Sequence, residues 1–145
     1  MLPGTYPEGW GRVYFNLISY SSQVNLLRLR TATDGSLAYA YVNTAGQLAL
    51  RNDAGATTQV SATTVGAGWH ALELHGLVNG ASGALEVWLD GARISDLSGT
   101  ANLGTVLIGR LQIGEVQSGR TYHVIFDDAA FNTTQVGLAA GGRAP

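Results

Sequence analysis

Two glutamates, Glu73 and Glu86, are the residues whose type and placement come nearest to hydrolytic chemistry. A glycosidase holds two carboxylates on either side of the scissile bond, roughly 5 to 10 Å apart. The alternating sequence around them predicts that both glutamates face the polar side of neighbouring or near-neighbouring strands. Charged residues in such positions are ordinarily solvated, so we favour that interpretation and predict that the protein is not an enzyme.

Nucleophilic catalysis and zinc binding find no support in the sequence. It lacks the Gly-x-Ser-x-Gly turn of many serine hydrolases, and His70, His75 and His123 have no evident nucleophile beside them. Zinc requires three or four convergent ligands, which this spacing does not suggest, and the chain has no cysteine. The three histidines are therefore expected to be surface or hydrogen-bonded strand residues.

Sugar binding is better supported. A pyranose ring presents apolar C–H faces between its hydroxyls, so sugar sites combine an aromatic platform with polar side chains. Trp88 is one candidate platform, and Arg93, Glu86, Glu73 and His75 are expected on the same polar face. The structural alternative has equal weight: Trp88 packs under a loop, and Arg93 stacks on its ring through a cation–π contact.

Tyr39 and Tyr41 form a second candidate platform. Residues two apart in a strand point to the same face of a sheet, so the two rings are expected side by side. Both sets of residues are retained as ligand-binding candidates.

The candidates around Trp88 belong to a predicted hairpin. Apolar residues alternate with Glu86, Trp88 and Asp90, and Asp90-Gly91 is a dipeptide typical of a two-residue hairpin turn. Such a loop sets Trp88 opposite Arg93 and leaves one face of the hairpin apolar.

The remaining pattern predicts a protein made of short strands. Turn signals recur about every ten residues, as in sandwiches and barrels, and no window has the pattern of an amphipathic helix. Further strands are expected at residues 12–18, 23–31, 37–42, 47–51, 57–64, 69–78, 106–113 and 121–131. Strict alternation places Asn25 on the face of Leu27 and Ile108 on the face of Arg110. Trp69 is expected in the core.

Four motifs are spread over most of the chain: G-W-H-A-L-E-L, E-V-W-L-D-G, L-I-G-R-L-Q-I-G and T-Y-H-V-I-F-D-D. Together they resemble the concanavalin A-like lectin/glucanase superfamily, in particular LamG-like modules of bacterial and phage surface proteins. The resemblance implies an all-β, antiparallel two-sheet jelly-roll sandwich over residues 11–132. Residues 1–10 would be an N-terminal arm and residues 133–145 a C-terminal tail or linker.

The resemblance also has implications for the acidic residues. In similar sandwiches a calcium ion often lies between an Asp of the last strand and carbonyls of the N-terminal segment, which would make Asp128 of the Asp127-Asp128 pair a ligand. Alternatively the pair caps a strand end or meets an arginine such as Arg120. The glucanases carry an E-x-D-x-x-E acid cluster on one strand. Here Glu86 is followed by Trp88, which argues against hydrolysis.

Many members of the superfamily begin with a further strand pair, whereas only ten residues precede the matching segment here. The strand at residues 12–18 is therefore expected at a sheet edge with unpaired N–H and C=O groups. We expect that edge to be covered by the arm or tail of a neighbouring subunit, or by a partner protein, through strand addition. A homo-oligomer follows from this.

Charge and hydropathy exclude several partners. The net charge is −2, and the eight basic residues, all Arg, are scattered along the chain, so there is no basic stripe for nucleic acid. No signal peptide and no apolar stretch long enough to span a membrane is evident, so any export information is expected outside this sequence or replaced by assembly into a virion.

These observations predict a surface-exposed module for glycan binding or adhesion, located outside the cell, on the cell surface or on a virion. The alternative is a structural assembly subunit, such as a capsid decoration, tail or cell-surface protein, that oligomerises through its open edge and terminal arms. A glycoside hydrolase ranks third. Calcium is the one cofactor considered.

Overall fold

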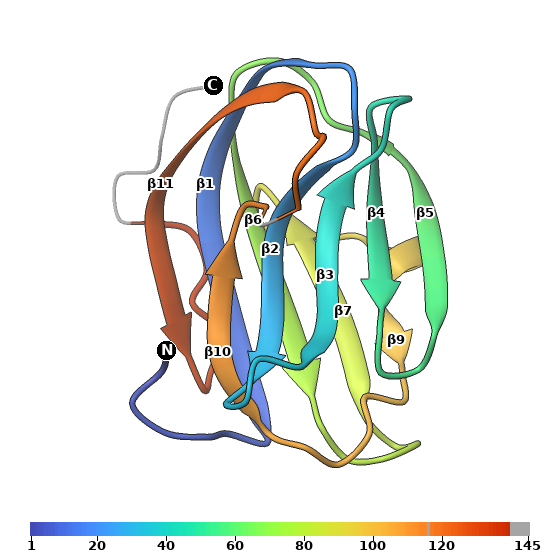
Figure 1. Cartoon of the computed structure of the whole chain (residues 1–145), viewed down its shortest axis with the longest axis vertical. Coiled ribbons are helices and arrows are strands. Elements are labelled where there is room, and N and C mark those ends of the chain that lie inside the picture. Colours follow the sequence, from blue (N-terminus) through green and yellow to red (C-terminus); the bar gives the residue numbers. More distant parts are fainter. Residues whose placement is uncertain (116, 140–145) are drawn as a thin grey trace.

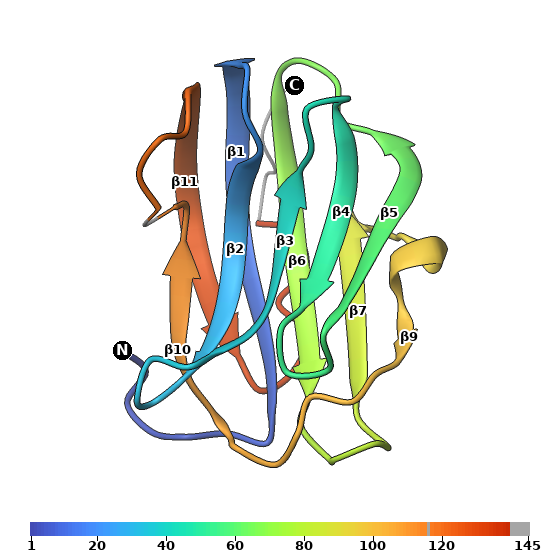
Figure 2. The same ribbon diagram turned by 45° about the vertical axis from the view of Figure 1, so that its right-hand side comes forward.

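The chain folds into two antiparallel β-sheets that pack face to face (Figures 1 and 2). The computed structural model describes residues 1–115 and 117–139. Sheet A has the strand order β10-β2-β3-β4-β5, and sheet B has the order β11-β1-β6-β7-β8, with β9 also pairing with β7. The predicted all-β, two-sheet sandwich is confirmed.

The elements are β1 (Glu8–Tyr20), β2 (Val24–Thr31), β3 (Ser36–Val42), β4 (Gln47–Asn52), β5 (Thr57–Thr64), β6 (Trp69–Leu77), β7 (Ala84–Leu89), β8 (Ala92–Arg93), the 3₁₀ turn η1 (Ser95–Leu97), β9 (Gly99–Thr100), β10 (Ile108–Ile113) and β11 (Tyr122–Asn132).

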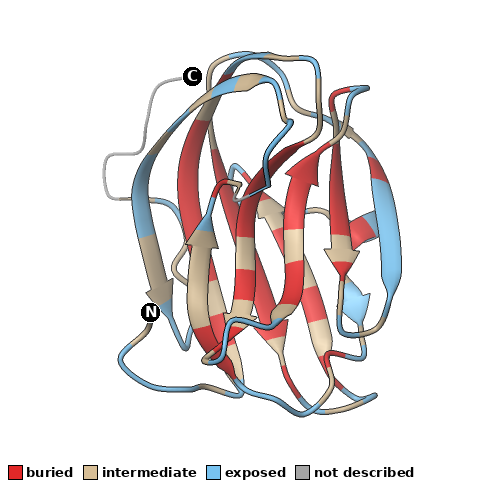
Figure 3. Ribbon diagram, in the orientation of Figure 1, coloured by how far each residue is buried: buried red, intermediate tan, exposed pale blue. Residues whose placement is uncertain are grey.

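The core lies between the inner faces of the two sheets. Phe15 on β1, Leu26 on β2 and Leu72 on β6 are fully buried there. Burying one such side chain stabilises the fold by roughly 1.5–3 kcal/mol. Buried residues concentrate on the central strands, whereas β5 and β11, at the sheet edges, are largely exposed (Figure 3).

The β7–β8 hairpin has the predicted register. Trp88 pairs with Arg93 and Leu89 with Ala92. Asp90 and Gly91 both have positive φ, at 54° and 84°, as a two-residue turn that matches the strand twist requires. The turn therefore fixes which side chains share the polar face with Trp88.

At two β-bulges, side chains point to the opposite face of the sheet from the one that strict alternation predicted. On β2 the register shifts between Asn25 and Leu27, so Asn25 pairs with Tyr41 on the outer face while Leu27 joins the core. On β10 it shifts between Ile108 and Arg110, which turns Ile108 inward. A bulge inserts one unpaired residue and reverses the phase of the alternation beyond it. Both face assignments made from the sequence were therefore wrong.

The β1 strand is an interior strand. It pairs with β6 from Glu8 to Asn16 and with β11 from Trp10 to Tyr20, so the predicted open edge does not exist. The β11 strand, the last strand of the described residues, fills the position that was predicted to be an open edge. The arm is also short, because β1 begins at Glu8, and it pairs with the β10 edge through a bridge between Tyr6 and Ile108.

Trp69 also departs from expectation. It is half-buried and lies outside the core cluster, because the alternation along β6 turns His70 toward core residue Phe15, with ring centroids 5.7 Å apart. In residues 1–115 and 117–139 there is no helix long and apolar enough to cross a membrane.

Candidate functional site

The seven ligand-binding candidates divide between the two outer faces of the sandwich. Tyr39 and Tyr41 project from β3 on sheet A. Glu73 and His75 on β6, Glu86 and Trp88 on β7, and Arg93 on β8 share the outer face of sheet B. The sandwich core separates the two groups, so they form two distinct candidate sites.

On sheet A one row of side chains crosses all five strands. Cross-strand pairing aligns Gln112, Arg28, Tyr39, Arg51 and Thr58, in strand order from β10 to β5. Cross-strand partners share a face of the sheet, so the row places an aromatic ring between polar groups. Gln112, Arg28 and Arg51 were not among the residues predicted from the sequence.

Tyr39 and Tyr41 lie side by side, with ring centroids 5.5 Å apart and an interplanar angle of 42°. Tyr39 is half-buried, whereas Tyr41 is only 8% exposed. Burial raises the pKa of the Tyr41 hydroxyl. Tyr39 is thus the accessible ring, and Tyr41 supports it from below the surface.

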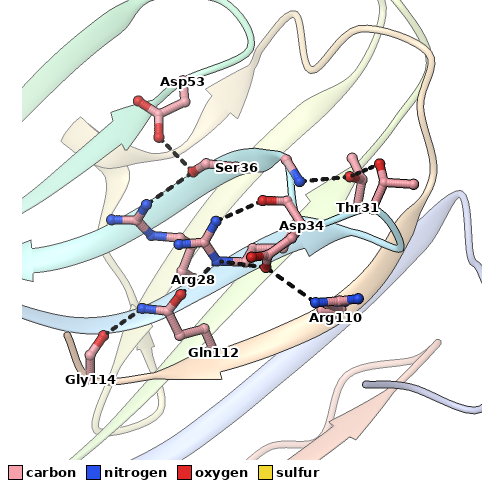
Figure 4. Close-up of polar contacts among 11 residues, drawn as sticks. Arg28, Thr31, Asp34, Ser36, Asp53, Arg110, Gln112 and Gly114 are labelled. Atoms are coloured by element: carbon pink, nitrogen blue, oxygen red, sulfur yellow. Dashed lines mark hydrogen bonds and ion pairs between the residues drawn. The ribbon is translucent and has the colours of Figure 1, made fainter. Parts of the chain in front are cut away.

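The guanidinium of Arg28 lies over the Tyr39 ring, 4.0 Å from its centroid. Its Nη1 donates a long hydrogen bond of 3.4 Å to Ser36 Oγ (Figure 4), while its Nε is shielded from solvent and has no hydrogen-bond partner. Burial, with the charge of Arg30, lowers the pKa of Arg28. A cation–π contact with Tyr39 therefore holds this side chain in place.

Two carboxylates, Asp34 and Asp53, lie among the arginines of this face (Figure 4). Asp34 Oδ1 lies 3.6 Å from Arg30 Nε and 3.4 Å from Arg110 Nη1. Asp53 accepts from Arg51 Nε at 3.1 Å and from the Ser36 hydroxyl at 2.5 Å. These contacts fix the polar groups on either side of Tyr39.

On sheet B, His75 lies between two carboxylates. Its ring nitrogens are 2.7 Å from Glu86 Oε1 and 2.7 Å from Glu8 Oε2, and Trp10 stacks on the imidazole with centroids 3.8 Å apart. Arg93 Nε donates to Glu86 Oε2 at 2.8 Å. Burial opposes ionisation of Glu86, but the hydrogen bonds from Arg93 and His75 outweigh it and lower its pKa.

Glu73 is enclosed by the chain itself. Its carboxylate accepts hydrogen bonds from the backbone N–H groups of Val136, at 2.7 Å, and Gly137, at 3.1 Å. Arg12 Nη1 donates to the carbonyl of Gly137 at 3.1 Å, and the N–H of Ala139 donates to the Tyr14 hydroxyl at 2.9 Å. Residues 135–139 therefore lie across sheet B. Of the predicted tail, residues 140–145 fall outside the described residues.

Trp88 is half-buried beside this segment. It lines a cleft of about 480 Å³ with Arg12, Gly91 and Leu138 among its walls, and its indole Nε1 is shielded from solvent without a hydrogen-bond partner. The predicted stacking of Arg93 on Trp88 is absent from the cation–π contacts of the described residues, because Arg93 is directed at Glu86.

Asp127 and Asp128 lie on β11 at a shift in its register with β1, where Asp128 has φ of 50°. The N–H of Asp128 donates to Asp127 Oδ1 at 2.8 Å, and its carbonyl accepts from Arg12 Nη2 at 2.9 Å. Within residues 1–115 and 117–139, no three His, Cys, Asp or Glu side chains converge as metal ligands would. The Asp128 carbonyl thus already serves a guanidinium, and calcium stays an untested prediction. Arg120 lies 3.4 Å from Glu115 instead.

Comparison with known proteins finds similarity in fold alone. No protein-family model matches the sequence, and no curated protein matches it. Among solved structures, the cellulose-induced protein Cip1 is 17% identical with a TM-score of 0.69, over 95% of this chain and 72% of that chain. A sialidase from Trypanosoma rangeli is 13% identical with a TM-score of 0.67, over 90% of this chain and 21% of that chain.

A carbohydrate-binding module, CBM66 from Bacillus subtilis, is 10% identical with a TM-score of 0.59, over 89% of this chain and 77% of that chain. Galectins share the fold as well. At identities this low the likeness concerns the fold, which is a concanavalin A-like jelly roll. The function has to be argued from the two polar faces.

Proposed function

We propose that this protein is a non-catalytic glycan-binding module whose sugar site is the outer face of sheet A. The observation that carries the proposal is the Tyr39–Tyr41 pair on the middle strand of the sheet, in register with polar side chains on the neighbouring strands. A sugar ring would pack its C–H face against the exposed part of the Tyr39 ring, beside the guanidinium of Arg28, and direct hydroxyls at Gln112 and Arg51. The fold is also that of a carbohydrate-binding module and of galectins.

The face of sheet B is less suited to a sugar. The carboxylate of Glu73 is used by residues 135–139, and the groups of His75 and Glu86 satisfy one another. A ligand there would have to displace contacts that the folded chain already makes. The polar groups beside Tyr39 are also bonded within the chain, since Gln112 contacts Arg30 and Gly114 and Arg51 contacts Asp53 and Thr58. They are nevertheless half-exposed, whereas Glu73 and His75 are buried.

The same contacts support the absence of catalysis. A general acid or nucleophile must reach the scissile bond, whereas Glu73 is 4% exposed and bonded to the backbone. Glu86 is held by Arg93 and His75, which favour its ionised form and disfavour a role as proton donor. Incubation with β-glucans, galactans and chitin should release no reducing sugar. Release that Glu73→Gln or Glu86→Gln abolishes would refute the proposal.

Glycan-array screening followed by calorimetry tests the binding site. Tyr39→Ala should weaken the binding of an array hit by about tenfold or more, which corresponds to ~1.4 kcal/mol. Trp88→Ala, on the opposite face, is the matched control and should leave the affinity unchanged. A silent array counts against the function, and loss of binding in Trp88→Ala alone would move the site to sheet B.

A structural assembly role is the second candidate, and one observation favours it. The β5 strand is an edge strand of sheet A and is mostly exposed, with Val60 at 49%. An exposed edge of this kind can accept a strand from another chain. Light scattering distinguishes the candidates, because a stable closed oligomer that Val60→Lys dissociates would support assembly. An extracellular or surface location accompanies either function as part of the proposal.

A further inference from the structure

The outer face of sheet A carries an excess of positive charge. Four arginines lie there, Arg28, Arg30, Arg51 and Arg110, against the two carboxylates of Asp34 and Asp53. This local surplus of two positive charges stands on a chain whose net charge is −2. The nearby Glu115 is itself paired with Arg120, 3.4 Å away. The face is therefore electrostatically distinct from the rest of the protein.

One of the two surplus charges belongs to Arg28, and the other to the two arginines that share one carboxylate. Asp34 serves both Arg30 and Arg110, and Asp53 serves Arg51. Among the described residues, no carboxylate lies within ion-pair distance of Arg28, whose polar contact is the 3.4 Å hydrogen bond to Ser36. Of the four arginines described on this face, Arg28 alone has no carboxylate within ion-pair distance.

The environment of Arg28 should strengthen its interaction with an anionic ligand. The side chain is half-buried and its Nε has no acceptor. The charge of Arg30 opposes its ionisation, whereas Asp53 and Glu115 favour it from beyond ion-pair distance. A partly desolvated cation interacts more strongly with an arriving anion than a solvated one does, because the effective dielectric constant is lower. Guanidinium groups are also well suited to planar anions such as carboxylates.

We propose that this face selects glycans with an anionic substituent, a uronate carboxylate or a sulfate ester, which lies against Arg28 while the sugar ring packs on Tyr39. The inference rests on the proposed function and narrows it to a ligand class. The 4.0 Å stacking of Arg28 on Tyr39 brings the cation and the aromatic platform to one spot. A single acidic sugar unit can therefore engage both groups.

Matched ligands that differ only in charge test the inference. An oligogalacturonide should bind about tenfold more tightly, or better, than its fully methyl-esterified form. A sulfated galactan oligosaccharide and its desulfated form make up the second arm and separate sulfate from carboxylate recognition. The preference should shrink as ionic strength rises, because salt screens a half-exposed ion pair.

Substitutions then assign the preference to Arg28. Arg28→Gln should bring the charged and neutral ligands to equal affinity, whereas Arg28→Lys should retain part of the preference. Arg93→Gln, on sheet B, removes the same charge as a control and should change nothing. Circular dichroism melts establish that each variant is folded, and the Lys variant keeps the inference testable if the Gln variant is not.

The outcomes distinguish failure of the anionic preference from failure of glycan binding as a whole. Equal binding of charged and neutral ligands by the wild type would overturn the anionic preference and leave glycan binding intact. Binding of neither member of any pair would count against both. Equally tight binding of a single-stranded DNA oligonucleotide would show a non-selective response to polyanions and would also overturn the inference.

Discussion

The carboxylate of Glu73 accepts a hydrogen bond of 2.7 Å from the backbone N–H of Val136, although 63 positions separate the two residues in the sequence. Gly137 adds a second N–H contact, and Arg12 holds the Gly137 carbonyl. A glutamate that the alternation of β6 places on a polar face is thereby 4% exposed. It anchors the C-terminal segment to sheet B.

Removing this anchor should release the segment. Glu73→Ala leaves two N–H groups without their acceptor and should lower the free energy of unfolding by roughly 1–3 kcal/mol. Hydrogen exchange should show that the amides of Val136 and Gly137 lose their protection. Glu8→Ala removes a carboxylate from the same face without touching the segment and is the control. Unchanged protection in Glu73→Ala would contradict the anchoring role.

Acid should destabilise the protein partly through Glu86. Its pKa in the folded state is lowered, so folding favours the ionised carboxylate. The resulting stabilisation is fully present above the pKa of the unfolded chain, about 4.3, and is lost as the pH falls through the folded-state value. Glu86→Gln should therefore reduce the dependence of the melting temperature on pH over this acidic range.

A second carboxylate, that of Asp96, contributes to the same loss of stability at acidic pH. Hydrogen bonds from the Ala62 N–H, at 2.9 Å, and the Ser61 hydroxyl, at 2.7 Å, lower the pKa of Asp96. Glu86→Gln and Asp96→Asn should each reduce the fall in melting temperature between neutral and acidic pH. The double variant should reduce it more than either single variant. If the melting temperature of the double variant depended on acidic pH as that of the wild type does, both assignments would be refuted.

The local parts of this fold were predictable because their causes are local. The Asp90-Gly91 turn sets the register of Trp88 and Arg93, and two-residue alternation placed Leu72 and Leu74 in the core. The β-bulges were not predictable, because one extra residue on β2 leaves no mark in the composition yet turns Asn25 outward.

The candidate sites depend on contacts between strands, and the sequence does not show which strands are neighbours. Tyr39 was found as an aromatic residue, but its partner Arg28 lies on another strand, and only the β2–β3 register brings the two together. The prediction that Trp88, Glu73 and His75 share one polar face did not place residues 135–139 on it. The Gly- and Ala-rich tail was considered as a linker or a docking strand, but its sequence does not indicate where it docks. The pairing of β1 on both sides was missed because the pattern of residues 121–131 predicts a strand but does not indicate its partner.

Trp88→Ala should lower the free energy of unfolding. The side chain is half-buried, with its ring 6.4 Å from that of Trp10. We expect a loss of unfolding free energy below the roughly 3–5 kcal/mol of a fully buried aromatic. Chemical denaturation measures it, with Val60→Ala on the exposed β5 strand as the near-neutral control. A loss as large as that of Phe15→Ala would show that Trp88 is a core residue.

Gly83, in the β6–β7 connection, should not tolerate a side chain. A Cβ atom at this position would lie 2.4 Å from the carbonyl oxygen of Leu77 and 2.7 Å from that of Ala101. Both atoms belong to the backbone, and the Gly83 carbonyl itself accepts a 2.9 Å hydrogen bond from Ala101, so neither neighbour can move without breaking the pairing. Gly83→Ala should lower the unfolding free energy by about 1–3 kcal/mol or more through overpacking. Gly66→Ala is the matched control, because nothing lies within 4 Å of its added methyl group, and equal melting temperatures for the two variants would refute the expected clash.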